Sequence, residues 1–260
     1  MVWRAVVRSC VGTRHQKQQQ PCQDYGSYCL LNNDVIVGAV ADGAGSAKYS
    51  DVGAQLAVVK VITMFREIAR SPQTEEPLSH PLNVKEARKL FSLIVREVVA
   101  TLERQALNEH YAIADLACTL LVFVATPHWL AAMQIGDGFI IVGLQGEKHK
   151  LLFQPDKGEF VNQTTFVTSA NALDQMQVNV FSGKQKFICA STDGLERVAI
   201  RMNDWTPFPP FFQPLEEYLW ETHNPEQDDE YIKNFLNSER LNARTDDDKT
   251  LLLCLYENRG

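Results

Sequence analysis

The sequence predicts an α+β fold in which two antiparallel sheets pack face to face and pairs of helices cover their outer sides. Short apolar or alternating stretches, typical of strands, lie near both ends of the chain and in its middle. Two long amphipathic helices follow each other directly, at 50–70 and 84–108. Because no strand separates them, the chain lacks the βαβ rhythm of a doubly wound parallel sheet. Packing the two sheets on each other, with helices outside, covers every apolar face.

The first strands are predicted at 2–8, 24–31 and 34–41. A polar, Gln-rich loop at 12–23 separates the first two. The Asn32-Asn33 pair forms the next turn, because asparagine tolerates the positive φ of a tight hairpin. The third strand contains VIVGAVA, which is apolar almost throughout, so both of its faces are expected to be covered.

Apolar residues at helical spacing predict the two long helices. Ser50 is the expected N-cap of the first, and Asp51 is favourable in its first turn. The stretch 71–83 contains three prolines and is expected to be a loop.

The rest of the chain returns to short apolar runs, the first three at the spacing of an antiparallel meander. The predicted elements are strands at 117–125, 129–135, 139–144, 186–190 and 250–256, a helix from residue 195 that the proline-rich segment 206–214 breaks, and a largely exposed helical region at 225–241. No repeat or linker interrupts the sequence, so residues 1–260 are expected to form a single domain.

Composition and charge narrow the function classes. Lys and Arg number 25 and Asp and Glu 32, for a net charge of −7, which gives no footprint for nucleic acid or an anionic membrane. No apolar run reaches the roughly 18 residues of a membrane span, and the N-terminus does not resemble a secretory signal. The six cysteines form no CxxC pair, so we expect no zinc ribbon but reduced thiols in the cytoplasm.

Aspartates occur at the ends of predicted strands. They are Asp24, Asp42, Asp137, Asp193 and Asp247. An isolated Asp-Gly is usually a turn, but Asp42 and Asp193 lead into helices, where the carboxylate alternatively acts as an N-cap. Five carboxylates at strand ends can converge at one edge of a sheet pair, and oxygen clusters suit Mg²⁺ or Mn²⁺. Two such ions about 3.5–4 Å apart can position a water for in-line attack on phosphorus.

Six motifs in order carry a family resemblance. They are Gln23-Asp24, Ala41-Asp42-Gly43-Ala44-Gly45, Cys118-Thr119-Leu120, Gly136-Asp137-Gly138, Ser191-Thr192-Asp193-Gly194 and Asp247-Asp248-Lys249-Thr250. With them the sequence resembles the metal-dependent serine/threonine protein phosphatases of the PPM, or PP2C, family, in a compact bacterial-type version. Each motif is weak alone, but the six together span nearly the whole chain.

The resemblance implies a four-layer α-β-β-α sandwich with two, or with a third site three, Mn²⁺ or Mg²⁺ ions at one end. It implies hydrolysis of phosphoserine and phosphothreonine in proteins through a water bridged by two ions, without a covalent phosphoenzyme. The implied partners are phosphoprotein substrates and a cognate serine/threonine kinase, and the chain is expected to act as a monomer without nucleic acid or membrane. A flap beside the site is expected at about 151–175.

The resemblance also assigns ligands by position. Asp42 would bridge two ions, with the Gly43 carbonyl on one and Asp193 and Asp247 on the other. Asp24 would hold metal-bound water or bind directly. Asp137, together with Asp193, would form a weaker third site.

Two departures from the family pattern concern the first motif. Gln23 replaces the usual Glu, as it often does in the small bacterial branch. The family's phosphate-binding Arg has no counterpart in the glutamine run before it, which leaves Arg14, His15 and Lys17 as candidates. His15 is preferred, because small bacterial members tend to have Gly-x-x-His there, as 12–15 does, and a histidine can protonate the leaving alkoxide or bind phosphate near pH 7. A histidine that is only solvated is the alternative.

Other interpretations remain. A catalytically weak phosphatase-like module that binds phosphoproteins or regulatory partners fits Gln23 and the missing Arg. An acidic, turn-rich scaffold without metal is a third hypothesis. The intact Asp24, Asp42, Asp193 and Asp247 favour the enzyme. No cysteine has Arg six residues on, and no GxxxxGK[ST] occurs, which excludes cysteine-dependent phosphatases and P-loop nucleotidases.

Overall fold

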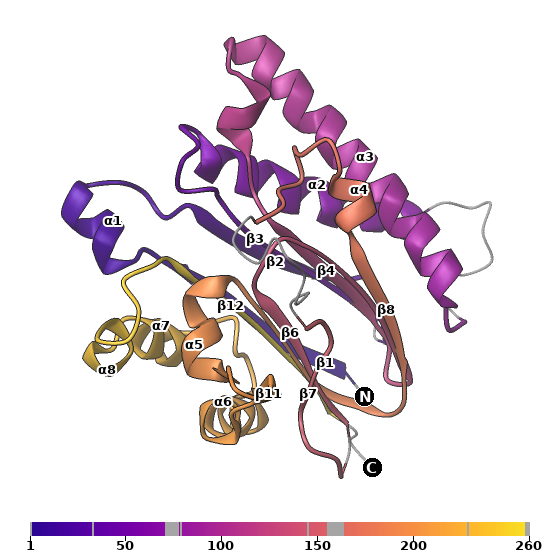
Figure 1. The fold of residues 1–260 in the computed structure, drawn as a ribbon. Coiled ribbons are helices and arrows are strands. Elements are labelled where there is room, and N and C mark those ends of the chain that lie inside the picture. Colours follow the sequence, from indigo (N-terminus) through magenta and orange to yellow (C-terminus); the bar gives the residue numbers. More distant parts are fainter. Residues whose placement is uncertain are drawn as a thin grey trace.

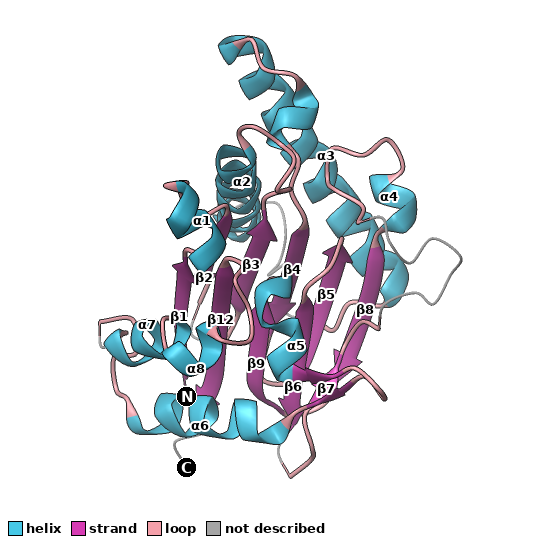
Figure 2. Cartoon of the chain, turned by 60° about the vertical axis from the view of Figure 1, so that its left-hand side comes forward, coloured by secondary structure: helices cyan, strands magenta, loops and turns pink. Residues whose placement is uncertain are grey.

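The structure, a computed structural model, describes residues 2–257 except 33, 71–77, 79, 145, 155–163 and 228. Two five-stranded antiparallel sheets lie face to face, and helices cover the outer side of each (Figures 1 and 2). The predicted α-β-β-α sandwich is therefore confirmed.

Each sheet takes strands from both halves of the chain. The first sheet runs β1 (Val2–Cys10), β12 (Lys249–Glu257), β9 (Gln185–Ser191), β6 (Phe139–Leu144) and β7 (Lys150–Leu151). The second sheet runs β2 (Asp24–Leu30), β3 (Ile36–Asp42), β4 (Leu120–Ala125), β5 (Trp129–Ile135) and β8 (Gln177–Ser182). A short ribbon joins β10 (Ile200–Arg201) and β11 (Thr206–Pro207).

Two groups of helices form the outer layers (Figure 2). The second sheet is covered by α2 (Ser50–Arg70) and α3 (Val84–Glu109), and the first by α5 (Glu196–Ala199), α6 (Pro209–Glu221), α7 (Glu230–Leu236) and α8 (Glu239–Asn242). The shorter helical elements are α1 (Thr13–Gln18), α4 (Ala172–Gln175) and the 3₁₀ turns η1 (Ile113–Leu116) and η2 (Asp193–Leu195). A capping box between Asn83 and Glu86 begins α3.

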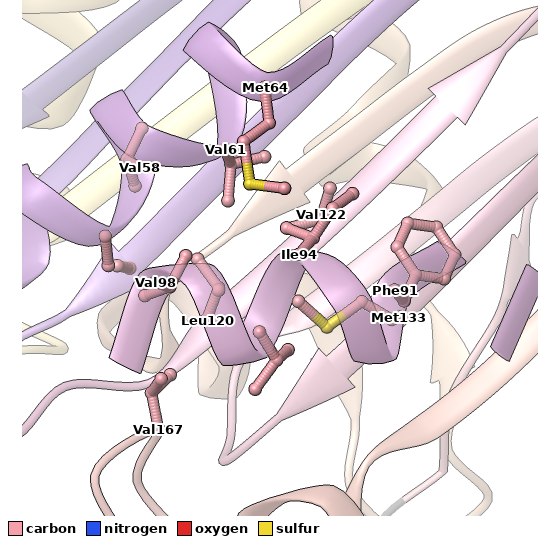
Figure 3. Close-up of a cluster of buried hydrophobic side chains, with 14 of the residues drawn as sticks. Val58, Val61, Met64, Phe91, Ile94, Val98, Leu120, Val122, Met133 and Val167 are labelled. Carbon is pink, nitrogen blue, oxygen red and sulfur yellow. The ribbon is translucent and has the colours of Figure 1, made fainter. Parts of the chain in front are cut away.

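Three apolar layers hold these elements together. Between the sheets, fully buried side chains such as Phe123 and Leu252 interlock. Figure 3 shows the layer under α2 and α3, where Val61 and Ile94 point toward Val122 of the second sheet. The central strands are buried on both faces, which explains why their sequences are continuous apolar runs.

Several element predictions hold. The helix at 50–70 and the strands at 129–135 and 139–144 have the expected bounds, and the helix at 84–108 extends one residue further. Others are wrong. The segment 12–23 is not all loop, because it contains α1. Ser50 is the first helical residue rather than a hydrogen-bonding N-cap, and its buried Oγ has no partner among the described residues.

The expected meander is also only partly right. β4 and β5 pair, but β6 joins the other sheet, so Asp137 lies at a crossing between sheets rather than in a hairpin. The proline-rich segment 206–214 begins α6 instead of only breaking a helix, because proline is favourable in the first turn. The helix from residue 195 is short. The 225–241 region contains α7 and most of α8 and is largely exposed, as expected, while Ile232 and Leu236 pack into the core.

The single-domain prediction stays a prediction, and part of the expected flap, 155–163, lies outside the described residues. Among the residues that the structure describes, no helix combines the length and apolar character required to cross a bilayer.

The contact between the sheets leaves no room at Gly38. A Cβ there would lie 2.4 Å from the Phe123 ring and 2.5 Å from Leu252 Cδ2 of the other sheet. We therefore expect Gly38→Ala to lower the free energy of unfolding by about 1–3 kcal/mol, through overpacking. Urea denaturation measures this. Gly45→Ala, where no atom lies within 4 Å of an added Cβ, is the control, and equal stability of the two variants would contradict the prediction.

Candidate metal centre

Strand pairing brings four of the predicted aspartates to the same end of the two sheets. Asp24 opens β2 and is the direct register partner of Asp42, which ends β3. In the other sheet, the first residue of β6 pairs with the last residue of β9. Asp137 lies two residues before that pair and Asp193 two residues after it, so both carboxylates lie at this end of the ladder.

Three carboxylates form a cluster. One oxygen from each of Asp42, Asp137 and Asp193 lies within 4.8 Å of the others, and all three residues are half-buried. A donor set made only of carboxylate oxygens is the kind that hard divalent cations such as Mg²⁺ and Mn²⁺ prefer. The residues present therefore fit the metal that the sequence predicts.

Asp24 lies behind this cluster. Its side chain is buried, its Oδ2 accepts a hydrogen bond from Thr192 Oγ1 at 2.6 Å, and it also hydrogen-bonds Asp42. The Thr192 hydroxyl in turn accepts from the backbone N–H of Thr250 at 3.0 Å. Asp24 of the second sheet is thus held by groups that belong to the first.

Asp247 lies at the edge of the cluster. Its charge raises the pKa of Asp193, and its Oδ1 forms an ion pair with Arg14 Nη2 at 2.7 Å. Its backbone carbonyl accepts from the buried Lys249 ammonium at 3.3 Å, and the same ammonium donates to Asn242 Oδ1 at 3.0 Å. The loop that carries Asp247 is therefore fixed from the protein interior, while its carboxylate faces an exposed cation.

Hydrogen bonds to two neighbouring segments hold the backbone around Asp42. Asp42 N–H donates to Thr119 Oγ1 at 2.9 Å, and Thr119 N–H donates to the Asp42 carbonyl at 2.8 Å. Gly43 N–H donates to the Gln23 carbonyl at 3.1 Å. A Cβ on Gly43 would lie 2.7 Å from Ser50 Cβ, so only glycine fits between these segments.

His15 is buried on α1 and lies apart from the carboxylate cluster. Its Nδ1 is 3.0 Å from Asp248 Oδ2, so it donates a hydrogen bond to that carboxylate. Arg14, the neighbouring candidate, is exposed and reaches Asp247.

Burial and mutual repulsion raise the pKa of several of these groups. The pKa of Asp42 is raised mainly by burial and then by Asp24 and Asp193. Burial likewise raises the pKa of Asp24 and Asp193, although hydrogen bonds from Asp42 and Thr192 oppose the shift at Asp24. Glu196 is raised to a pKa of about 7 by burial and by Asp137. A bound cation would relieve this repulsion.

The sequence assigned no role to three residues near the cluster. Glu196 adds a further carboxylate to the field at Asp137 and Asp193, and Thr164 Oγ1 donates to Asp137 Oδ2 at 2.9 Å. Asp248 is buried and bonds to the segment around His15. Only Asp248 had a sequence signal, namely its place in a run of three aspartates before a strand.

Sequence comparisons place the chain among known proteins. The model of a family described as "Protein phosphatase 2C" matches residues 11–237. The chain is 35% identical over 262 residues to "Serine/threonine-protein phosphatase 3" of Escherichia coli (strain K12), an alignment that covers 98% of this chain and 99% of that protein.

Solved structures share the fold at low identity. A serine/threonine phosphatase of S. agalactiae superposes with a TM-score of 0.65 at 15% identity, covering 98% of this chain and 100% of that one. The catalytic domain of the serine threonine protein phosphatase PstP, solved with 2 manganese ions, gives a TM-score of 0.61 at 16% identity and covers 98% of both chains. At these identities the likeness concerns the fold.

The raised pKa values predict how the stability of the metal-free protein depends on pH. The folded protein holds protons on these carboxyls more tightly than the unfolded chain does. Their contribution to the free energy of unfolding is therefore complete below the pKa values of the unfolded chain. This contribution is lost as pH rises through the pKa values of the folded protein. For Glu196 the loss falls between about pH 4.5 and about pH 7. In EDTA, the melting temperature should fall from pH 5 to pH 8.

Adding Mn²⁺ should remove most of that fall, because the cation replaces the protons and binds only the folded state. Circular dichroism melts at each pH measure both effects. Asp193→Asn should flatten the curve in EDTA. A metal-free melting temperature that is constant or rises over this range would contradict the prediction.

Proposed function

The chain belongs to the protein phosphatase 2C family, and from that premise we propose that it hydrolyses phosphoserine and phosphothreonine monoesters on proteins, with Mn²⁺ or Mg²⁺ as its cofactor. The observation that carries the proposal is the convergence of Asp42, Asp137 and Asp193 within 4.8 Å. When bound, two such ions supply Lewis acidity that activates water and neutralises charge on a phosphoryl group.

The positions of the side chains support the ligand roles that the resemblance assigns. Asp42 is central, since it lies in the cluster and hydrogen-bonds Asp24, so we propose it as the bridging ligand, with the Gly43 carbonyl beside it. Asp193 and Asp247 complete the proposed pair of sites. We propose a third site at Asp137 and Asp193, and the number of ions bound is part of the proposal.

Asp24 would orient water at the site rather than only bind an ion. It is buried and accepts a hydrogen bond from Thr192, so its carboxylate has one fixed direction. The role of His15 as a proton donor stays a prediction. Its burial and its bond to Asp248 favour a part in holding the segment 12–23.

Arg14 is the group that we propose to bind the phosphate of the substrate. It is exposed and its guanidinium already lies 2.7 Å from a predicted metal ligand, Asp247. An exposed ion pair contributes about 0–1 kcal/mol, so exchanging the carboxylate for phosphate costs little. The planar guanidinium suits bidentate contact with phosphate oxygens.

Several finer points remain predictions. They are a cognate kinase, a monomeric chain, a location in the cytoplasm, and a flap at about 151–175 within a single domain.

Loss of a central ligand should abolish turnover. We expect Asp42→Asn and Asp193→Asn to reduce Mn²⁺-dependent hydrolysis of p-nitrophenyl phosphate by more than about 100-fold, because even partners behind the ligands are worth 10–100-fold. Asp34→Asn is the matched control. Asp34 lies in the turn before β3, at the opposite end of that strand from Asp42, and its Oδ1 accepts from Tyr256 Oη, which an amide oxygen preserves.

Metal-independent hydrolysis, or full activity in both variants, would refute the proposed function. Thermal stabilisation by Mn²⁺ without turnover of any phosphopeptide would instead favour the alternative, a catalytically weak phosphatase-like module that binds phosphoproteins or regulatory partners.

The assignment of Arg14 predicts a separate effect on substrate binding. Arg14→Ala should raise KM for a phosphopeptide by about tenfold or more, since a hydrogen bond to a charged group contributes about 1.5–3 kcal/mol. Steady-state kinetics at saturating Mn²⁺ measure it. Lys17→Ala, an exposed cation on the same helix, should leave KM unchanged, and the reverse result would transfer the role to Lys17.

A further inference from the structure

Asp248 is a buried carboxylate that lies next to a predicted ligand without belonging to the cluster. Only 2% of its surface is exposed. Its Oδ1 accepts from the backbone N–H of Gly12 at 2.6 Å. Its Oδ2 accepts from the backbone N–H of Gln23 at 2.6 Å and from His15 Nδ1 at 3.0 Å. Three donors therefore meet one carboxylate.

These donors all come from one segment, 12–23. That segment leaves β1 in the first sheet and returns as β2 in the second, with α1 between them. Asp248 binds its beginning, its helix and its end. Two further contacts reinforce the junction, since Arg14 N–H donates to the Asp246 carbonyl at 3.0 Å and a Cβ on Gly12 would lie 2.2 Å from the Asp247 carbonyl carbon.

The junction joins two ligand-bearing segments. Gln23, whose N–H Asp248 holds, directly precedes Asp24, and Asp248 itself directly follows Asp247. Arg14 lies within the clamped segment and reaches Asp247. Asp24 is also held by its pairing with Asp42, so the junction is what ties Asp247 and Arg14 to this end of β2.

We propose that Asp248 is a positioning residue whose bonds to Gly12, His15 and Gln23 set the spacing between the Asp24–Asp42 pair and Asp247 and hold Arg14 over the site. It touches neither the cations nor the substrate. Cation affinity and phosphate binding both depend on it. This inference rests on the proposed function for its consequences, but the clamp itself is a property of the metal-free protein.

The three donors around position 248 require a carboxylate there. Every partner is an N–H donor, and an ionised carboxylate offers acceptors on both oxygens. An asparagine would turn its NH₂ group toward at least one of these donors. A buried ionised group is tolerated only when such bonds compensate its desolvation, and charge-assisted bonds of this kind are strong.

Three variants test the inference. Asp248→Ala removes all three bonds, Asp248→Asn removes at least one, and His15→Ala removes one donor. Arg4→Ala is the matched control. Arg4 is also a buried charged side chain, and it donates to the carbonyls of Leu219, Trp220 and Thr222. It lies on β1 beside Leu255, at the end of β12 that is far from Asp248.

Two measurements separate positioning from general stability. Hydrogen–deuterium exchange of the metal-free protein should show faster exchange over 11–23 in Asp248→Ala, with the core strands protected. The Mn²⁺ concentration giving half of the maximal thermal shift should rise about tenfold or more, the size expected for a residue behind metal ligands, and KM should rise as for Arg14→Ala. Asp248→Asn and His15→Ala should give smaller changes in the same direction.

Arg4→Ala should lower the melting temperature while leaving the Mn²⁺ midpoint within about twofold of the wild type. If Asp248→Ala shows wild-type exchange and a wild-type Mn²⁺ midpoint, or only the effect of Arg4→Ala, the inference is overturned. If Asp248→Ala does not fold, the other two variants decide by the same criteria. If the wild type itself neither binds Mn²⁺ nor turns over, the proposed function fails, while the exchange comparison still decides whether the clamp exists.

Discussion

Four carboxylates meet at one end of the two sheets, and their repulsion works against the fold that holds them together. Burial raises the pKa of Asp24, Asp42 and Asp193, which is the mark of charge placed where water cannot solvate it. The apolar layers and the strand ladders must therefore supply the stability that this site removes. A cation bound there would relieve this repulsion.

The frame is rigid because each aspartate sits at a position that pairing fixes. The β2–β3 ladder sets Asp24 opposite Asp42, and the end of the β6–β9 ladder brings Asp137 and Asp193 close together. The apolar layer between the sheets then fixes one ladder against the other, and close contacts such as Gly38 with Leu252 of the other sheet leave little freedom to slide. Function at the end of the sandwich thus depends on packing throughout its interior.

Three consecutive residues at the start of β12, Asp247, Asp248 and Lys249, make different contacts. Asp247 faces the site and its exposed partner Arg14, Asp248 faces the interior and holds 12–23, and Lys249 is buried against Asn242. One short acidic run therefore supplies both a proposed metal ligand, Asp247, and the proposed anchor of the segment 12–23, Asp248.

The sequence by itself determined which residues are buried, the period of the long helices and the aspartates at strand ends, because apolar patterning and turn chemistry are local. The bounds of α2, β5 and β6 follow from that information, while the convergence of Asp42 with Asp137 and Asp193 depends on how the two sheets pack. Only the tertiary structure decided that β6 crosses to the other sheet, that a proline pair begins α6, and that Asp248 binds three distant donors. Strand partners and buried hydrogen bonds depend on contacts between segments far apart in the chain, and a local pattern carries no record of them.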